Sequence, residues 1–182
     1  FTGAVYQPFS YETPQKEDEL SEKDNFEYIS QFQLSDFMRR LLVKRFESSF
    51  GSFDKSIRRF KDLYINALSF IKRTNKYILD RQLIEKIYAE DDDVIDQALQ
   101  EYQDKLETGN FPKRDKVYKV DEFHEKEQFL SAIQSDIDMF TEIIDTLDLM
   151  DLVSDDPKGA CLIDHLKQEL HKKPKSKESK RK

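Results

Sequence analysis

Apolar side chains recur at helical spacing along most of the chain from position 34 onwards. Over 34–46 they follow the i, i+3, i+4, i+7 order that places them on one face of a helix, and the same order resumes over 53–71. Two serines and a glycine within 48–51 interrupt the stripe, and glycine inside a helix costs up to about 1 kcal/mol relative to alanine. The pattern predicts two long helices with a kink or break at 48–51, the second ending at Asn75, a residue that tolerates a left-handed C-cap.

Further segments with the same periodicity follow. Asp80 is suited to cap a short helix, aspartates at 91–93 to open another, and Pro157 to begin the last, since proline fits the first helical turn. The predicted helices span 83–88, 91–107, 122–152 and 157–170.

The remaining segments lack a helical period. Residues 1–33 are punctuated by proline and acidic side chains and are predicted to be irregular, and 117–120 is predicted to be a short extended piece. The basic end, 172–182, is predicted to be a disordered tail. The expected organisation is therefore an irregular segment at 1–33, a helical domain at 34–171 and the tail.

Composition agrees with the periodicity. Glycine and proline number only 4 and 5 in 182 residues, whereas folds made of strands and turns need more turn residues. The expected fold class is all-α, a bundle of about five helices.

The single cysteine bears on location. Cys161 has no partner for an internal disulfide, which is typical of a reduced, cytoplasmic protein, and its apolar neighbours predict a small core residue. No apolar run approaches the roughly 20 residues needed to cross a bilayer, so no membrane partner is expected.

Charge is distributed unevenly. The chain carries a formal net charge of −7, yet the stretch 37–61 has eight basic residues against Glu47 and Asp54. Such a stretch either forms ion pairs with the acidic segments 15–27 and 91–107 or contacts a phosphate backbone or another partner. The candidate contact residues are Arg39, Arg40, Lys44, Arg45, Arg58 and Arg59. Of these, Lys44, Arg58 and Arg59 are expected to point outward.

No enzyme motif accompanies this stretch. The chain lacks a phosphate-binding loop of the G-x-x-x-x-G-K-[ST] type and a G-x-G-x-x-G motif, and its three histidines lie far apart. The acidic run at 90–93 does not match a calcium loop. The chain itself is therefore expected to have no catalytic residue, no metal site and no cofactor.

The string F-M-R-R-L-L-V-K-R-F-E-S-S-F-G-S-F resembles a helix that follows the first ATPase lobe in bacterial Swi/Snf-like superfamily-two helicases. The matching residues are Arg40, Leu42, Lys44, Arg45, Glu47, Ser48 and Ser49. The opening F-T-G-A-V-Y-Q-P-F and the closing D-P-K-G-A-C-L-I-D-H-L-K-Q-E-L with its basic tail resemble the junctions with the two lobes.

The resemblance implies a non-catalytic helical region cut from a longer DNA helicase or translocase. Its partners would be the two flanking ATPase lobes and DNA, and ATP and magnesium would belong to those lobes. A stand-alone helical adaptor for a protein partner is the alternative, and a small enzyme with an unrecognised carboxylate site is a third hypothesis. The coding sequence on either side of the chain distinguishes the first two.

Overall fold

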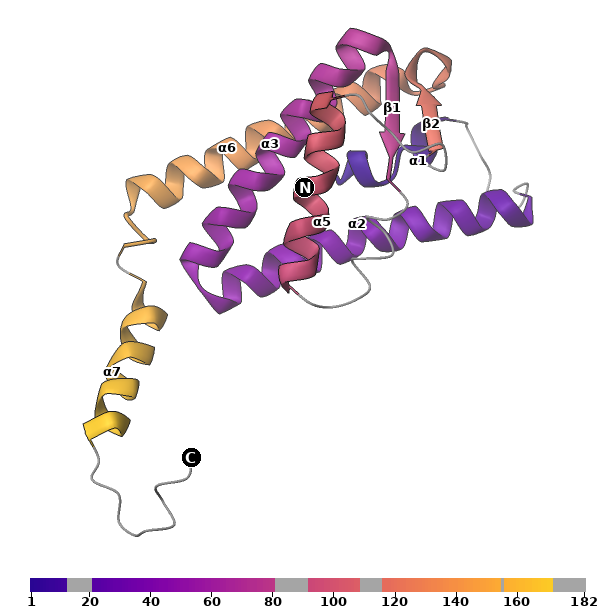
Figure 1. The fold of residues 1–182 in the computed structure, drawn as a ribbon. Coiled ribbons are helices and arrows are strands. Elements are labelled where there is room, and N and C mark those ends of the chain that lie inside the picture. The colour runs from indigo at the N-terminus through magenta and orange to yellow at the C-terminus, as the bar shows by residue number, and fades with distance from the viewer. Residues whose placement is uncertain (13–20, 81–91, 109–115, 155, 172–182) are drawn as a thin grey trace.

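The computed structural model describes residues 1–12, 21–80, 92–108, 116–154 and 156–171. Its elements are two short 3-10 turns, six α-helices and two strands in these residues (Figure 1). They run in the order η1 (Ala4–Tyr6), α1 (Phe9–Glu12), α2 (Glu22–Ser48), α3 (Phe50–Thr74), β1 (Lys76–Leu79), α5 (Asp92–Thr108), β2 (Lys116–Lys119), η3 (Val120–Glu122), α6 (Lys126–Leu149) and α7 (Pro157–His171). The all-α helical bundle predicted from the sequence is confirmed.

A helical hairpin forms the frame of the molecule. Ser49 is its one-residue corner: it ends α2, begins α3 and has extended backbone angles. The Ser49 hydroxyl accepts a hydrogen bond from the Ser52 N–H at 3.0 Å, which caps the first turn of α3. At the far end Asn75 has a φ of 53° and closes α3 as a left-handed C-cap. The predicted break and the predicted stop are both confirmed.

The start of α2 differs from the prediction. The helix begins at Glu22, where Ser21 accepts a hydrogen bond from the Asp24 N–H, so residues 22–33 are helical and not irregular. This part of α2 presents exposed apolar side chains, among them Phe26 and Phe32, and therefore shows no core-facing stripe in the sequence.

The N-terminal segment also departs from the expected irregular lead-in. Ala4, Val5 and Tyr6 are fully buried in the same core as the long helices. The carboxylate of Asp136 on α6 accepts hydrogen bonds from the Thr2 N–H at 2.6 Å, the Thr2 hydroxyl and the Gly3 N–H. Residues 1–12 are thus an integral part of the helical body.

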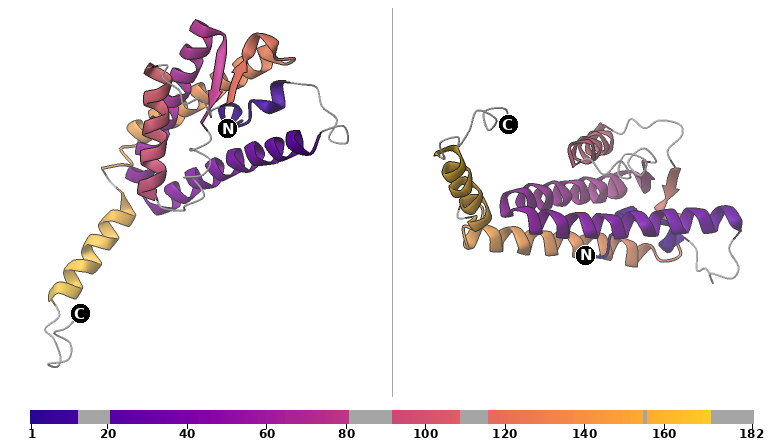
Figure 2. Two further views of the ribbon diagram at one scale, coloured as in Figure 1. Left: turned by 45° about the vertical axis from the view of Figure 1, so that its right-hand side comes forward. Right: turned by 90° about the horizontal axis from the view of Figure 1, so that it is seen from below.

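Helix α3 is central to the body and packs against α2, α5 and α6. Figure 2 shows α2, α3 and α6 side by side. Aromatic rings fill the layer between α3 and α6, where Tyr64 and Phe140 meet edge to face with centroids 5.3 Å apart. Phenylalanine and tyrosine provide most of the large, fully buried side chains.

A two-stranded antiparallel sheet caps one end. The register pairs Lys76 with Lys119 and Leu79 with Lys116. The extended piece predicted at 117–120 corresponds to β2, whereas β1 was not predicted. The helix predicted at 83–88 and the predicted tail at 172–182 lie outside the described residues.

Helix α7 extends away from the body (Figures 1 and 2). It begins at Pro157 as predicted, but its apolar residues do not enter a core: Leu166 is 51% and Leu170 82% exposed. Cys161 is exposed as well, so its prediction as a core residue was wrong. The apolar period correctly predicts the helix, but within the described residues the body offers no surface that covers its stripe.

Candidate nucleic-acid interface

All six predicted contact residues lie on the hairpin. Arg39, Arg40, Lys44 and Arg45 belong to α2, and Arg58 and Arg59 belong to α3. Arg45 and Arg59 lie at the corner around Ser49. Lys44 is exposed on α2, and the other three have the partners described below.

Arg39 has an internal structural contact. Its guanidinium donates from Nη2 to the Thr2 carbonyl at 2.9 Å and from Nε to the Phe1 carbonyl at 3.3 Å. The side chain is half-buried and fastens the N-terminal segment to α2. This contact leaves Arg39 poorly placed for a nucleic acid.

Arg40 and Arg58 are exposed but engaged by carboxylates. Arg40 pairs with Asp36 one turn away at 3.2 Å. Arg58 pairs with Asp54 on its own helix at 2.9 Å and with Asp148 on α6 at 2.5 Å. Although desolvation lowers the pKa of Arg58, the charges and hydrogen bonds of the two carboxylates outweigh it and raise that pKa. Its positive charge is therefore largely compensated.

Three basic side chains converge at the corner of the hairpin. A pocket of about 570 Å³ is lined by Arg45 from α2 and by Lys55 and Arg59 from α3. We call this the elbow pocket, which is completed by Ser49, Gly51, Ser52, Ser56 and Val153. Arg45 is only 8% exposed, Arg59 is half-buried and Lys55 is exposed. Lys44, Arg58 and Arg59 were predicted to point outward. Lys44 and Arg58 are exposed, whereas Arg59 is half-buried.

The local sequence explains the convergence. Lys55 and Ser56 lie three and four residues after Ser52, and Arg59 follows them by four and three. Helix α3 therefore presents all four on one face beside the end of α2. The Arg45 Nη1 donates to the Ser52 hydroxyl at 3.4 Å. The Ser56 hydroxyl donates to the Ser52 carbonyl at 3.0 Å. These contacts hold the hydroxyls and the guanidinium in one place.

The connection between α6 and α7 closes one side of the corner. The Asp156 carboxylate accepts a hydrogen bond from the Phe50 N–H, the first amide of α3, at 3.0 Å. The Lys158 ammonium donates to the last carbonyls of α2, those of Phe46 and Glu47. Both contacts suit the helix dipoles, since a carboxylate meets an N-terminus and a cation meets a C-terminus.

The electrostatic character of the elbow pocket follows from its lining. Three basic residues and three serines line it, and none of the described residues that line it is acidic. Guanidinium, ammonium and hydroxyl groups are the donors that proteins use for phosphate oxygens. The described lining is therefore rich in residue types that donate hydrogen bonds to anionic groups.

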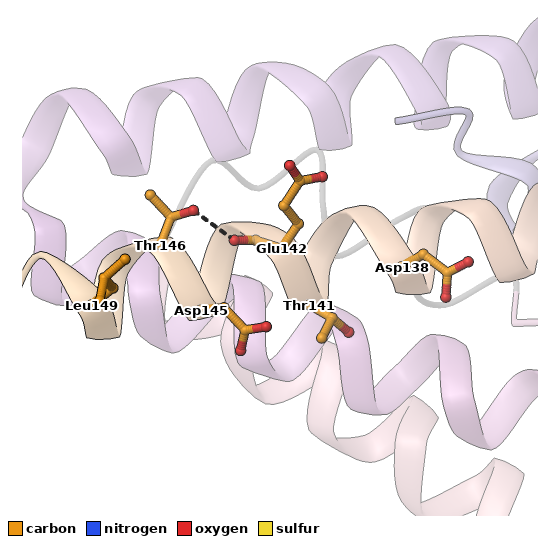
Figure 3. Close-up of a pocket in the computed structure, with 6 residues that line it drawn as sticks. All are labelled: Asp138, Thr141, Glu142, Asp145, Thr146 and Leu149. Atoms are coloured by element: carbon orange, nitrogen blue, oxygen red, sulfur yellow. Dashed lines mark hydrogen bonds between the residues drawn. The ribbon is translucent and has the colours of Figure 1, made fainter.

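A second hollow lies on α6 and has the opposite charge. It has a volume of about 420 Å³ and is lined by Asp138, Thr141, Glu142, Asp145, Thr146 and Leu149. The Glu142 carboxylate points away from those of Asp138 and Asp145 (Figure 3). No group of three or more histidine, cysteine or acidic side chains among the described residues is placed to hold a metal ion. This face of α6 is a solvated acidic surface.

The sequence reasoning missed part of the elbow pocket. Lys55 belongs to the basic stretch but was not predicted as a contact residue. Ser49 was interpreted as part of the helix break, and Ser52 and Ser56 were assigned no role. Their shared spacing with Arg59 on α3 was the available signal. Val153 comes from a distant segment, and no local pattern places it at this corner.

Comparisons with protein-family models, curated proteins and solved structures gave no match for this chain. In the described parts of the chain, no helix is both long and apolar enough to cross a membrane. The functional interpretation therefore depends on the residues of the hairpin.

Proposed function

We propose that this chain is a non-catalytic helical region of a Swi/Snf-like superfamily-two DNA translocase, which contacts the nucleic-acid backbone and links the flanking ATPase lobes. The observation that carries the proposal is the gathering of Arg45, Lys55 and Arg59 at the corner of the hairpin. Neutralising phosphates with basic side chains supplies most of the affinity of sequence-independent nucleic-acid binding. The resemblance of 37–53 to the helix after a first ATPase lobe supports the same assignment.

In this proposal the chemistry takes place outside the chain. ATP and magnesium belong to the flanking lobes, and the helical region provides a rigid body between them. The aromatic core between α3 and α6 gives that body its rigidity. Contacts with phosphate positions orient a protein on nucleic acid without reading its sequence, which suits a translocase that moves along varied DNA.

A helical adaptor for a protein partner is the second candidate. The exposed apolar stripe of α7, including Ile163, Leu166 and Leu170, is the observation that favours it. A binding helix typically presents anchors at such i, i+3, i+7 positions. The two candidates differ in what surrounds the chain: only a translocase requires ATPase motifs on both sides.

The test begins with the coding sequence that flanks this chain. The proposal expects a phosphate-binding loop and a magnesium-holding acidic motif before Phe1, and arginine-finger motifs after Lys182. Their absence would contradict the translocase assignment and favour the adaptor.

The second part of the test uses the full-length protein so identified. Lys44 and Lys55 are both exposed, and changing them to glutamate places negative charge on the surface proposed to contact DNA. DNA-stimulated ATP turnover at limiting DNA should fall at least about tenfold, because the removal of each basic side chain weakens binding to the phosphate backbone. A control pair, Lys72→Glu with Arg73→Glu at the other end of α3, makes the same charge change and should retain most of the activity. Equal reductions in turnover for both pairs would argue against binding at the elbow.

A further inference from the structure

We infer that two copies of this chain form a twofold-symmetric dimer in which α7 of each copy packs on α2 of the other. Such a dimer is independent of the proposed function. Its contacts use two exposed apolar surfaces, one on α7 and one on the N-terminal half of α2, which lie at opposite ends of the molecule (Figures 1 and 2).

The first surface is a narrow apolar stripe on α7. Its four side chains are each more than half exposed, and at about 100° per residue they fall within an arc of about 100°. They are Leu162, Ile163, Leu166 and Leu170. We call them the α7 stripe. A stripe of this width is typical of a helix that packs one face against a neighbouring surface.

The second surface lies on the N-terminal half of α2. It consists of Phe26, Ile29 and Phe32, which are all exposed, Phe26 by as much as 75%. We call these three residues the α2 patch. They project to one side of the helix, within an arc of about 120°. Phenylalanine contributes most when its large ring is buried, so two exposed rings in one patch indicate a surface that associates with another.

Helix α7 is too short to cover the α2 patch of its own chain. Its base is fastened at the Ser49 corner, where Asp156 contacts the start of α3 and Lys158 contacts the end of α2. Phe26 lies 23 residues before Ser49 on α2, which is about 34 Å at about 1.5 Å per residue. Helix α7 has 15 residues and is only about 22 Å long. The two surfaces can therefore meet only between two copies.

An antiparallel arrangement of the two α2 helices brings the surfaces together. Helix α7 points away from the Ser49 end of its own body and can thus run along the α2 helix of the partner (Figure 2). With Leu170 beside Phe26 of the partner, the corner lies near position 39 of that partner, and the twofold axis passes near Val43. Val43 and Phe46 are exposed on the same side of α2 as the α2 patch, so apolar side chains also meet at the axis.

The charges next to the two surfaces are complementary. Residues 15–27 carry six acidic side chains against two basic ones, whereas residues 172–182, which follow α7, carry seven basic side chains against one acidic. Antiparallel packing brings the C-terminal end of α7 to the N-terminal end of the partner's α2, and these opposite charges favour that pairing. A contact between two α7 helices would instead add like charges.

Symmetry provides the area that a stable dimer needs. Specific interfaces bury at least about 1,200 Å² in total, which is more than one short helix on three side chains provides. The twofold axis forms the contact between α7 and α2 twice and adds the contact near Val43. Because each copy uses both of its surfaces, the arrangement is closed and association stops at two copies.

Sedimentation equilibrium of the purified chain over about 1–300 μM tests the dimer and should show monomer and dimer with no larger species. Leu166→Asp and Phe26→Asp should each raise the dissociation constant at least about hundredfold, because each of two symmetric contacts loses at least about tenfold. The control, Val117→Asp, changes an exposed apolar residue on β2 and should alter it less than about threefold. Circular dichroism at concentrations where the wild-type chain is monomeric should show that all three variants are folded.

Mixing the two variants identifies the surfaces that touch. The Leu166→Asp chain keeps an intact α2 patch and the Phe26→Asp chain keeps an intact α7 stripe, so the mixed dimer retains one of the two contacts. Its dissociation constant should be at least about tenfold lower than that of either variant alone. Fluorescence anisotropy measures it with a label on Cys161, which is exposed and lies on the side of α7 opposite the stripe.

Each alternative result overturns the inference in a recognisable way. A chain that stays monomeric throughout the concentration range excludes the dimer, and the α7 stripe is then covered by a different protein. Loss of the dimer with Leu166→Asp alone means that α7 pairs with α7, and loss with Phe26→Asp alone means that α2 pairs with α2. A mixture that associates no better than its components also excludes the packing of α7 on α2, and species larger than a dimer exclude the twofold closure.

Discussion

Gly3 is the residue on which the N-terminal segment turns into the core. Its φ of 74° lies in the left-handed region, and a Cβ there would sit 2.2 Å from the Ser35 hydroxyl oxygen. Its N–H donates to Asp136 at 3.0 Å. Both the backbone angle and the close approach therefore require glycine.

Replacing Gly3 with alanine should destabilise the fold by at least about 2 kcal/mol, because a left-handed alanine is strained and its Cβ would overlap the Ser35 hydroxyl. Denaturant unfolding measured by circular dichroism checks this. The control is Gly159→Ala in α7, where the nearest atoms to a new Cβ are 3.8 Å away. That variant should be neutral or slightly stabilising, and a similar destabilisation in both variants would contradict the strain argument.

The partners of the basic side chains in 37–61 also differ from residue to residue. The composition of this stretch showed an excess of positive charge, but Arg39 contacts Phe1 and Thr2, and Arg58 contacts Asp148 as well as the nearby Asp54. Phe1, Thr2 and Asp148 lie far away in sequence. Only the fold brings them together. The basic stretch could thus be identified in the sequence, whereas the partners of its side chains could not.

At the scale of elements, the sequence predicted those helices that bury a stripe. Helices α3 and α6 show the period clearly because one face of each packs in the core. The first half of α2 does not, since it is largely exposed, and only Ser21 and the acidic first turn marked its start. Strand β1 is too short for a period and depends on pairing with β2.

Helix α7 is the element whose period misleads about its environment. Its stripe is as regular as that of a core helix, yet Leu166 is exposed. An amphipathic pattern shows that one face of a helix is apolar. It does not show that the same chain buries that face. The pattern is therefore equally compatible with a surface that another protein covers.

Changing Leu166 to aspartate should leave the stability of the body nearly unchanged, within about 0.5 kcal/mol, as for other exposed positions. The matched change Leu147→Asp, in the buried face of α6, should cost about 3 kcal/mol or more because it buries a charge. Thermal melts by circular dichroism measure both. If the two variants were destabilised equally, α7 would pack on the body in solution.

For the whole molecule, the tyrosine hydroxyls within the core are the chief titratable feature. The hydroxyl oxygens of Tyr77 and Tyr102 lie 2.7 Å apart, and the carbonyls of Val5 and Ile78 accept hydrogen bonds from Tyr77 and Tyr102 respectively. Desolvation raises the pKa of both phenols above the ordinary value of 10.0, and burial likewise raises that of Tyr6 and Tyr64. The folded protein therefore keeps protons that the unfolded chain releases.

The sign of the pH dependence follows directly. Above about pH 10 the unfolded state binds fewer protons than the folded one, so stability falls as pH rises, by up to about 1.4 kcal/mol per pH unit for each such phenol. Below that pH these groups contribute no slope. Denaturant unfolding between about pH 8 and pH 11, with tyrosinate absorbance followed in parallel, measures it. Ionisation of these phenols near pH 10 while the protein is still folded would contradict the prediction.

The attachment of α7 has a mechanical consequence. Asp156 and Lys158 fasten its base to the two helix ends at Ser49, and the rest of the helix extends free of the body. With 15 residues, α7 is a lever arm of about 22 Å, so a rotation of about 10° at its base carries its far end about 4 Å. A small rotation at the hairpin corner therefore produces a much larger displacement at the C-terminal end of α7 than at its base.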